Sequence, residues 1–248
     1  MPEARRKFLP GLAAALLLQQ GVAYAFDVPP PGRLGEDRVT VDASLETMSF
    51  RTGSLDVNVT LAPLGSIYAS GLRVRLGAGR SWYDFLANDA EGRIARGFGF
   101  EGNLLVGYSI TTTRLNLVGL IGVASSETTD QGLNRADHGA KAVMSVFARP
   151  TDRTMAYASF SHSTIRTTSQ MQVKFGTTMA NGLQVGPEAN LVWRHNYPWN
   201  ASTSSWRVGV HLSSMRLGPW YFGVSGGWLR DRDLGDGHYI GTSIYGSF

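Results

Sequence analysis

The sequence predicts an all-β protein: a transmembrane, antiparallel, up-and-down β-barrel of twelve strands. Three observations predict it: long segments of alternating apolar and polar residues, connections of alternating length, and tryptophans near segment ends. The alternation is clearest in residues 184–194, where the odd positions are apolar: Val185, Pro187, Ala189, Leu191 and Trp193. Successive strand residues point to opposite faces, so this strand has one apolar side and one mainly polar side. Its length matches the ~9–11 residues with which a strand crosses a bilayer.

Residues 1–25 have the features of a secretory signal peptide. Arg5, Arg6 and Lys7 precede an apolar core at 8–18, and Ala23-Tyr24-Ala25 is a small-x-small cleavage site. The apolar core is too short for a membrane anchor. We therefore expect export and cleavage, which leaves 20 basic and 18 acidic residues in the mature chain. Such a balance, without a basic run, predicts no nucleic-acid partner.

The composition excludes several other classes of protein. The chain has no cysteine, which excludes a disulfide scaffold, thiolate catalysis and cysteine metal sites. After the signal peptide, no run of about 18 apolar residues predicts a transmembrane helix. The five histidines show none of the spacings of known metal motifs, so neither a metal site nor a cofactor is expected.

Residues 26–38, which contain Pro29, Pro30 and Pro31, predict an irregular periplasmic lead-in to a barrel at 39–248. Twelve strand segments follow, at 41–50, 54–63, 71–83, 96–110, 113–124, 139–149, 153–163, 169–179, 183–195, 204–213, 219–230 and 238–248. Pro187 lacks an N–H group and a closed barrel has no free edge, so we expect a β-bulge there.

The connections alternate in length along most of the chain. The short ones are at 111–112, 150–152, 180–182 and 214–218, and the longer polar ones are at 84–95, 125–138, 196–203 and 231–237. In outer-membrane barrels the short turns are periplasmic and the long loops extracellular. If the last strand runs toward the periplasm, all four long loops fall outside, and both chain ends lie in the periplasm.

Aromatic residues are expected to form two girdles at the membrane surfaces. Four tryptophans fall at the outer ends of strands and one at the inner end: Trp82, Trp193, Trp206 and Trp228, and Trp220. The terminal residue Phe248 ends an alternating strand and resembles the signal by which known barrels are inserted into the outer membrane.

Charged residues occupy the polar side of many segments and are expected to face the lumen. The candidates are Arg73, Arg75, Glu101, Lys141, Lys174, Glu188, Arg194 and Arg207, with Asp42, Glu46 and Asp56. They either contact a sugar chain or an anion, or form ion pairs that fill a narrow barrel. Only Tyr221 and Tyr245 are expected as inward-facing aromatics, which argues against a wide glucan pore.

A catalytic site is not expected. Ser161, His162 and Ser163 suggest a serine–histidine pair, but neighbours on one strand point to opposite faces and cannot easily share a proton. A lipid-modifying enzyme that uses His162 with a residue from another strand remains an alternative.

Several short segments together resemble the BcsS family of bacterial cellulose-biosynthesis proteins. They are Leu61-Ala62-Pro63-Leu64-Gly65-Ser66, the stretch 70–76, and the stretches 102–108, 139–142, 186–189 and 207–209. The resemblance implies a protein of the outer membrane of a Gram-negative bacterium, accessory to cellulose or other exopolysaccharide production. It implies outer-membrane lipid as a partner, together with the cellulose-synthase machinery or a glucan chain. The excess of interior bases leaves a narrow porin for anionic oligosaccharides as the alternative.

Overall fold

The computed structural model describes residues 37–49, 51–86, 94–130, 133–180, 182–196, 201–232 and 235–248. The predicted signal peptide at 1–25 lies outside the described residues, as does the lead-in except for Asp37 and Arg38. No helix in the described ranges is long and apolar enough to cross a membrane.

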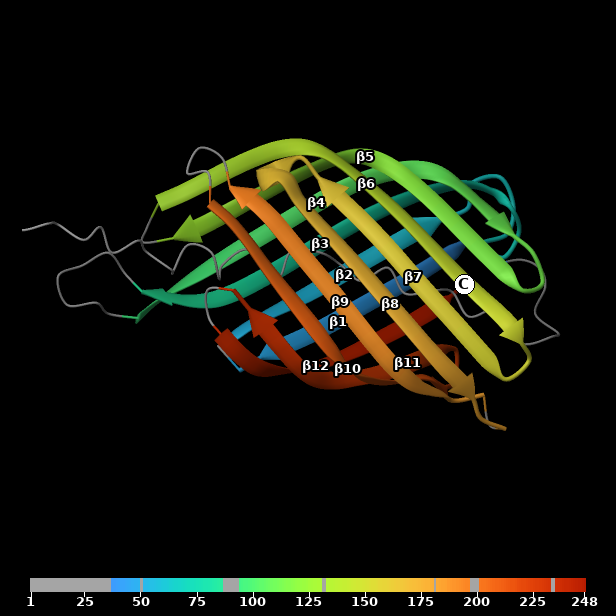
Figure 1. Cartoon of the computed structure of the whole chain (residues 1–248). Coiled ribbons are helices and arrows are strands. Elements are labelled where there is room, and N and C mark those ends of the chain that lie inside the picture. The colour runs from blue at the N-terminus through green and yellow to red at the C-terminus, as the bar shows by residue number, and fades with distance from the viewer. Residues whose placement is uncertain are drawn as a thin grey trace, which may run out of the picture.

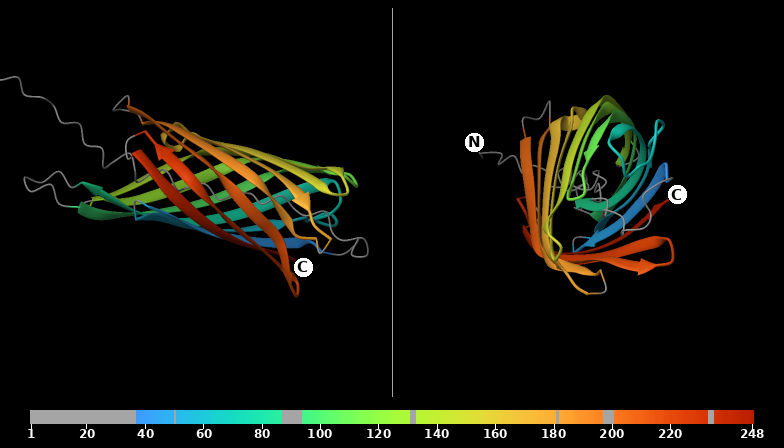
Figure 2. Two further views of the ribbon diagram at one scale, coloured as in Figure 1. Left: turned by 60° about the horizontal axis from the view of Figure 1, so that its bottom comes forward. Right: turned by 90° about the vertical axis from the view of Figure 1, so that its right-hand side faces the viewer.

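The described chain forms a closed barrel of twelve antiparallel strands, which confirms the predicted fold class (Figures 1 and 2). Each strand pairs with its neighbours in sequence, and β1 pairs with β12 to close the wall. The strands are β1 (Val39–Met48), β2 (Thr52–Leu61), β3 (Gly71–Leu86), β4 (Ile94–Thr111), β5 (Leu115–Asp130), β6 (Leu133–Thr151), β7 (Thr154–Ser163), β8 (Thr168–Thr178), β9 (Gln184–Asn196), β10 (Ala201–Leu217), β11 (Trp220–Asp231) and β12 (Gly235–Ser247). A single 3₁₀ turn, η1 (Ile165–Thr167), connects β7 and β8 in the described part.

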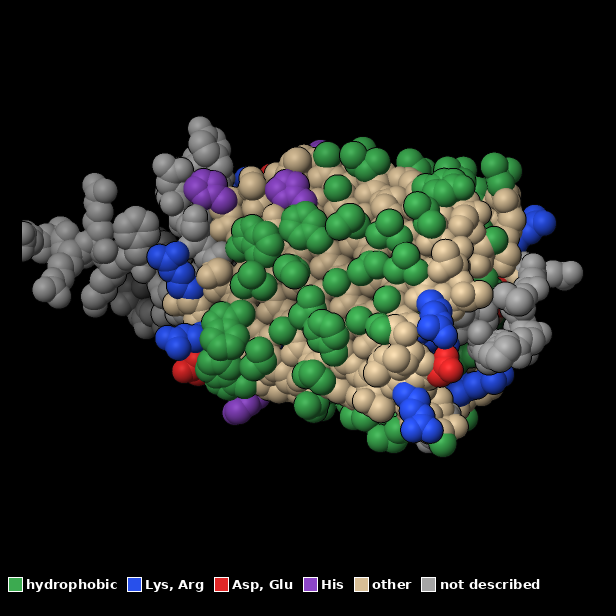
Figure 3. Space-filling view, turned by 45° about the vertical axis from the view of Figure 1, so that its right-hand side comes forward, with side chains coloured by type: hydrophobic (Ala, Val, Ile, Leu, Met, Phe, Trp, Pro, Cys, Tyr) green, Lys and Arg blue, Asp and Glu red, His purple; other side chains and the backbone are tan. Residues whose placement is uncertain are grey.

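The outside of the barrel is apolar and the inside is polar. Among the described residues, 30 buried residues are polar or charged and only 15 are hydrophobic, the reverse of a water-soluble core. Exposed hydrophobic side chains cover the wall between two polar rims (Figure 3). On β5, for example, Ile121 and Val123 are each 64% exposed, whereas Leu120, next to Ile121 on the opposite face, is 4% exposed. This surface is suited to hydrocarbon, so the barrel is a membrane-spanning one.

The polar interior also contains apolar clusters, one of which lies on β4 and β5. Leu105, Val118 and Leu120 form a buried cluster on β4 and β5, against which Val143 of β6 packs. This cluster explains why the β5 sequence carries apolar residues on both faces: one set faces lipid and the other fills the barrel.

The predicted loop 125–138 is wrong, because β5 and β6 continue through most of it to Asp130 and from Leu133. Likewise β3 reaches Leu86 and β4 begins at Ile94 within the predicted loop 84–95. Beyond the membrane both faces of a strand meet water, so the apolar alternation that marks a strand disappears while the pairing continues. These long hairpins extend past the other strands at the outer end of the barrel (Figure 1).

The bulge predicted at Pro187 is also wrong. Pro187 pairs in register with Val210, and the β8–β9 register is the same on both sides of it, at Lys174–Glu188 and Thr177–Val185. The Phe175 carbonyl, opposite a residue without N–H, accepts a hydrogen bond from the buried His211 imidazole at 3.0 Å from Nε2. A side chain therefore replaces the missing backbone donor, and the strand needs no extra residue.

The register shifts occur elsewhere. One lies between Leu212 and Met215 of β10, where Ser214 has a φ of 63°, and the other lies between Ala148 and Thr151 of β6. Both are near the end of the barrel where β1 begins and β12 ends, which the sequence predicts to be the periplasmic end. A bulge there bends the strand at the rim without disturbing the wall.

Candidate functional site: a filled interior with an arginine cluster at its outer mouth

Ion pairs and hydrogen bonds connect the inward-facing side chains of the barrel. Glu101 of β4 accepts a hydrogen bond from Lys141 of β6 at 2.6 Å. Lys174 of β8 lies 3.0 Å from Glu188 of β9, which also accepts a hydrogen bond of 2.7 Å from the Tyr239 hydroxyl of β12.

Two of the interior contacts join strands that are not neighbours in the barrel wall. Tyr239 reaches Glu188 across β10 and β11, and Arg207 of β10 pairs with Glu46 of β1 across β11 and β12. The Arg207 guanidinium also lies over the Tyr239 ring, 5.3 Å from its centroid. At Gly209, between Tyr239 and Glu188, an added Cβ would lie 2.4 Å from the tyrosine hydroxyl oxygen, so a larger residue would block the contact.

The eight charged residues predicted from the sequence to face the lumen are all buried in the barrel: Arg73, Arg75, Glu101, Lys141, Lys174, Glu188, Arg194 and Arg207. Buried charges require partners. Glu101 pairs with Lys141, Glu188 with Lys174 and Tyr239, and Arg207 with Glu46. The inward-facing charges in the middle of the barrel are therefore held in pairs.

Arg73 and Arg75 have different partners. Arg73 lies at the periplasmic end, where its guanidinium donates to the carbonyls of Ile67 (3.0 Å), Ala69 and Leu72 (2.9 Å). It therefore holds the β2–β3 turn in place. Arg75 donates from Nε to the Thr60 hydroxyl at 3.0 Å.

The interior contains more aromatic residues than the sequence analysis expected. Besides Tyr221 and Tyr245, the buried aromatic side chains are Tyr83, Phe147, Tyr157 and Tyr239. At the periplasmic end, Phe147, Tyr157, Tyr221 and Tyr245 line a cavity of about 60 Å³. This volume is far below the ~300–1,000 Å³ of typical ligand pockets, so at this place the rings fill most of the space.

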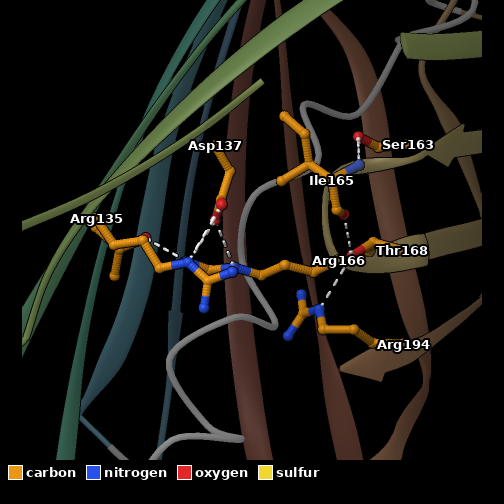
Figure 4. A network of polar contacts seen from close by, with 8 residues as sticks. Arg135, Asp137, Ser163, Ile165, Arg166, Thr168 and Arg194 are labelled. Atoms are coloured by element: carbon orange, nitrogen blue, oxygen red, sulfur yellow. Dashed lines mark hydrogen bonds and ion pairs between the residues drawn. The ribbon is translucent and has the colours of Figure 1, made fainter. Parts of the chain in front are cut away.

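At the outer end, the η1 segment carries Arg166 toward the barrel interior (Figure 4). The Ser163 hydroxyl accepts a hydrogen bond from the Ile165 N–H (3.2 Å), and the Thr168 hydroxyl donates to the Ile165 carbonyl (3.3 Å). Arg166 and Thr167 both adopt the left-handed backbone conformation, with φ of 53° and 41°. Such angles are unfavourable for side chains larger than glycine, so the surrounding contacts must hold this turn.

Two further arginines, Arg135 and Arg194, belong to the same network of contacts as Arg166. Arg166 donates from Nε to Asp137 of β6 (3.3 Å) and from Nη2 to Thr128 of β5 (3.0 Å). Arg135 also contacts Asp137, at 3.1 Å, and Arg194 of β9 donates to the Thr168 hydroxyl at 3.1 Å. Burial lowers the pKa of the Arg166 guanidinium, and nearby Arg135 lowers it too, while the Asp137 carboxylate opposes both effects.

Of this arginine cluster (Arg135, Arg166 and Arg194), the sequence analysis identified only Arg194. Arg135 falls in the segment predicted as a loop, and Arg166 falls in the connection between β7 and β8. Neither position shows an alternation that would indicate an inward direction, so sequence pattern alone could not find them.

The aromatic residues proposed for the girdles lie on the outer wall. At the outer end, Trp193 and Trp206 are 38% and 40% exposed, and Trp206 packs edge-on against Trp228, with centroids 4.7 Å apart. Trp82 pairs with Phe98 in the β3–β4 ladder at the same end. At the periplasmic end Trp220 packs edge-on against Phe248, at 5.3 Å.

A serine–histidine pair exists, but not between strand neighbours. His162 of β7 pairs in register with Ser169 of β8, and its Nδ1 lies 2.8 Å from the Ser169 hydroxyl. Ser169 is the only side-chain partner of His162 in the described part of the chain, so no third group orients the imidazole. No group of three potential metal ligands occurs among the described residues.

A family model described as "Cellulose biosynthesis protein BcsS" matches residues 58–248, more than three quarters of the sequence. The chain belongs to the BcsS family. Family membership gives this BcsS protein a role in cellulose biosynthesis, and its barrel places it in the outer membrane. No curated protein matches the chain.

Solved structures similar to this BcsS protein are outer-membrane barrels. LpxR from Salmonella typhimurium aligns with a TM-score of 0.56 and 14% identity over 84% of this chain and 100% of that one. The KdgM porin aligns with a TM-score of 0.48 and 10% identity over 84% of this chain and 99% of its own. At these identities the LpxR likeness shows the fold alone.

Proposed function

We propose that this BcsS protein is a non-enzymatic accessory of cellulose biosynthesis, which anchors the export machinery in the outer membrane or assists it without conducting the polymer. The observation that carries the proposal is the set of interior contacts between strands that are not neighbours, above all Arg207–Glu46 and Tyr239–Glu188. A glucan chain would have to separate these buried charged groups, and being neutral it offers no charge to replace the lost partners.

The proposal predicts that the reconstituted mature protein gives no steady current in planar lipid bilayers. Replacing both Arg207 and Glu46 by Ala removes one of these interior contacts and is expected to raise the conductance. The matched control is the double replacement of Arg114 and Asp152 by Ala, an exposed pair 3.8 Å apart on periplasmic turns, which should change nothing. A steady anion-selective current through the unaltered protein would instead establish the porin for anionic oligosaccharides.

The 2.8 Å contact between His162 and Ser169 favours a second candidate, a lipid-modifying enzyme with Ser169 as nucleophile and His162 as base. The accessory role predicts that deletion of the gene lowers cellulose at the cell surface and that the His162→Ala variant restores it. The outer-membrane lipid profile should be the same in the wild-type and His162→Ala strains. A lipid species that disappears in the His162→Ala strain alone would establish the enzyme.

A further inference from the structure

The arginine cluster gathers positive charge from three separate elements. Arg135 comes from β6, Arg166 from η1 and Arg194 from β9. Within the network of Figure 4 the one carboxylate is that of Asp137, which contacts Arg135 and Arg166, whereas Arg194 donates to Thr168. Arg194 is repelled by Arg166 and attracted by Asp231 and Glu101, which lie outside this network. The network itself therefore carries two positive charges in excess.

The cluster leads from the solvent into the barrel. The side chain of Arg135 is 53% exposed and that of Arg166 is 11% exposed, whereas Arg194 is buried, with 3% of its surface accessible. Positive groups arranged along a path of decreasing water content attract anions from outside and hold them more strongly with depth.

The deepest group has unused hydrogen-bonding capacity. Arg194 donates from Nε to Thr168, but its buried Nη1 has no hydrogen-bond partner among the described residues. Leaving a buried charged donor unsatisfied is costly. Guanidinium groups match carboxylate and phosphate oxygens, with which they form paired, charge-assisted hydrogen bonds.

The position of the cluster limits the source of the ligand. Arg194 alternates with Trp193, which lies on the outer wall, so the guanidinium and the lipid are on opposite sides of the barrel wall. Lipid head groups cannot reach it through the wall. The ligand must therefore enter from the extracellular solution through the outer mouth.

We propose that Arg135, Arg166 and Arg194 form an extracellular anion-binding site, which takes the carboxylate or phosphate group of a solute or acidic sugar. The turn that bears Arg166 holds two consecutive left-handed residues, so the backbone presents this guanidinium at a fixed place before a ligand arrives. The site is independent of the accessory role. It lies nearer the outer mouth than the Arg207–Glu46 and Tyr239–Glu188 contacts, so a ligand reaches it without passing them.

The test is isothermal titration calorimetry of the full mature protein in detergent at low salt, with sodium phosphate, sodium glucuronate and glucose as three separate titrants. Glucose should give no binding heat, and at least one of the two anions should bind. Binding of phosphate alone or glucuronate alone identifies which oxyanion the site prefers. The Arg166→Gln and Arg194→Gln variants should each weaken anion binding by about tenfold or more.

Two comparisons separate binding from folding. Arg194→Lys keeps the buried charge and should retain part of the affinity, and Arg114→Gln, which removes an exposed charge at the other end of the barrel, should retain all of it. A closed barrel migrates differently on a gel from the heat-unfolded chain, so the migration of unheated against heated samples reports whether each variant has folded. Failure of both anions to bind the unaltered protein, or equal binding by folded Arg166→Gln and Arg194→Gln variants, would overturn the proposal.

Discussion

Replacing Glu101 by Gln is expected to lower the free energy of unfolding by about 3–5 kcal/mol, the cost of leaving one member of a buried ion pair without its partner. Lys141 is 6% exposed and lies 2.6 Å from Glu101, so the amide would leave its charge buried beside a neutral group. Urea unfolding in lipid vesicles, followed by tryptophan fluorescence, measures the change.

The matched control is Asp152→Asn, which breaks the exposed pair with Arg114 and should cost less than about 1 kcal/mol. The double variant Glu101→Gln with Lys141→Met removes both charges and should recover most of the lost stability. If Glu101→Gln were no more destabilising than Asp152→Asn, the interior would be wet and the ion pairs would not seal it.

Placing a charge on the middle of the outer wall should have the second-largest effect. The Ile121→Arg variant is expected to lose about 2–4 kcal/mol in lipid vesicles, because a guanidinium at the bilayer midplane must be taken from water into hydrocarbon. Ile121 is 64% exposed on β5 and pairs with Val106, which is itself 47% exposed on the outer wall.

The same substitution at Thr129, eight residues further along β5 on the same face, should cost only about 0–1 kcal/mol, because depth controls the penalty. Thr129 pairs with Phe98 in the ladder, at the level of Trp82. Equal losses at Ile121 and Thr129 would mean that this part of the wall is not in contact with the centre of a bilayer.

Much of the barrel was predictable because lipid and lumen select different residue types on alternate positions. In β9, Leu191 and Trp193 are exposed while Glu188 and Arg194 are buried, as the alternation predicts. The same signal gives the number of strands. The alternation ends where the hairpins leave the membrane, although the strands continue. For this reason β5 and β6 are longer than the sequence predicted.

The partners of the inward-facing groups could not be predicted. Arg207 and Glu46 are 161 residues apart, and only the register around the closed barrel brings them together. The left-handed turn at Arg166 also has no sequence signal, because such angles are ordinarily marked by glycine or asparagine. The candidate anion site depends on both kinds of information and so emerges only from the structure.

The seam between β1 and β12 determines when this protein can exist as a barrel. Thr40 pairs with Ser247, and the Phe248 carbonyl accepts hydrogen bonds from the N–H groups of Arg38 and Val39. The first strand to be synthesised, β1, can therefore pair with β12 only after the last strand has been made. Until then β1 has an unpaired edge that is open to wrong pairing. Contacts so distant in sequence form slowly. The polypeptide must therefore reach the outer membrane through an aqueous compartment before the barrel has closed. Until β12 pairs with β1, its apolar face is exposed to aggregation.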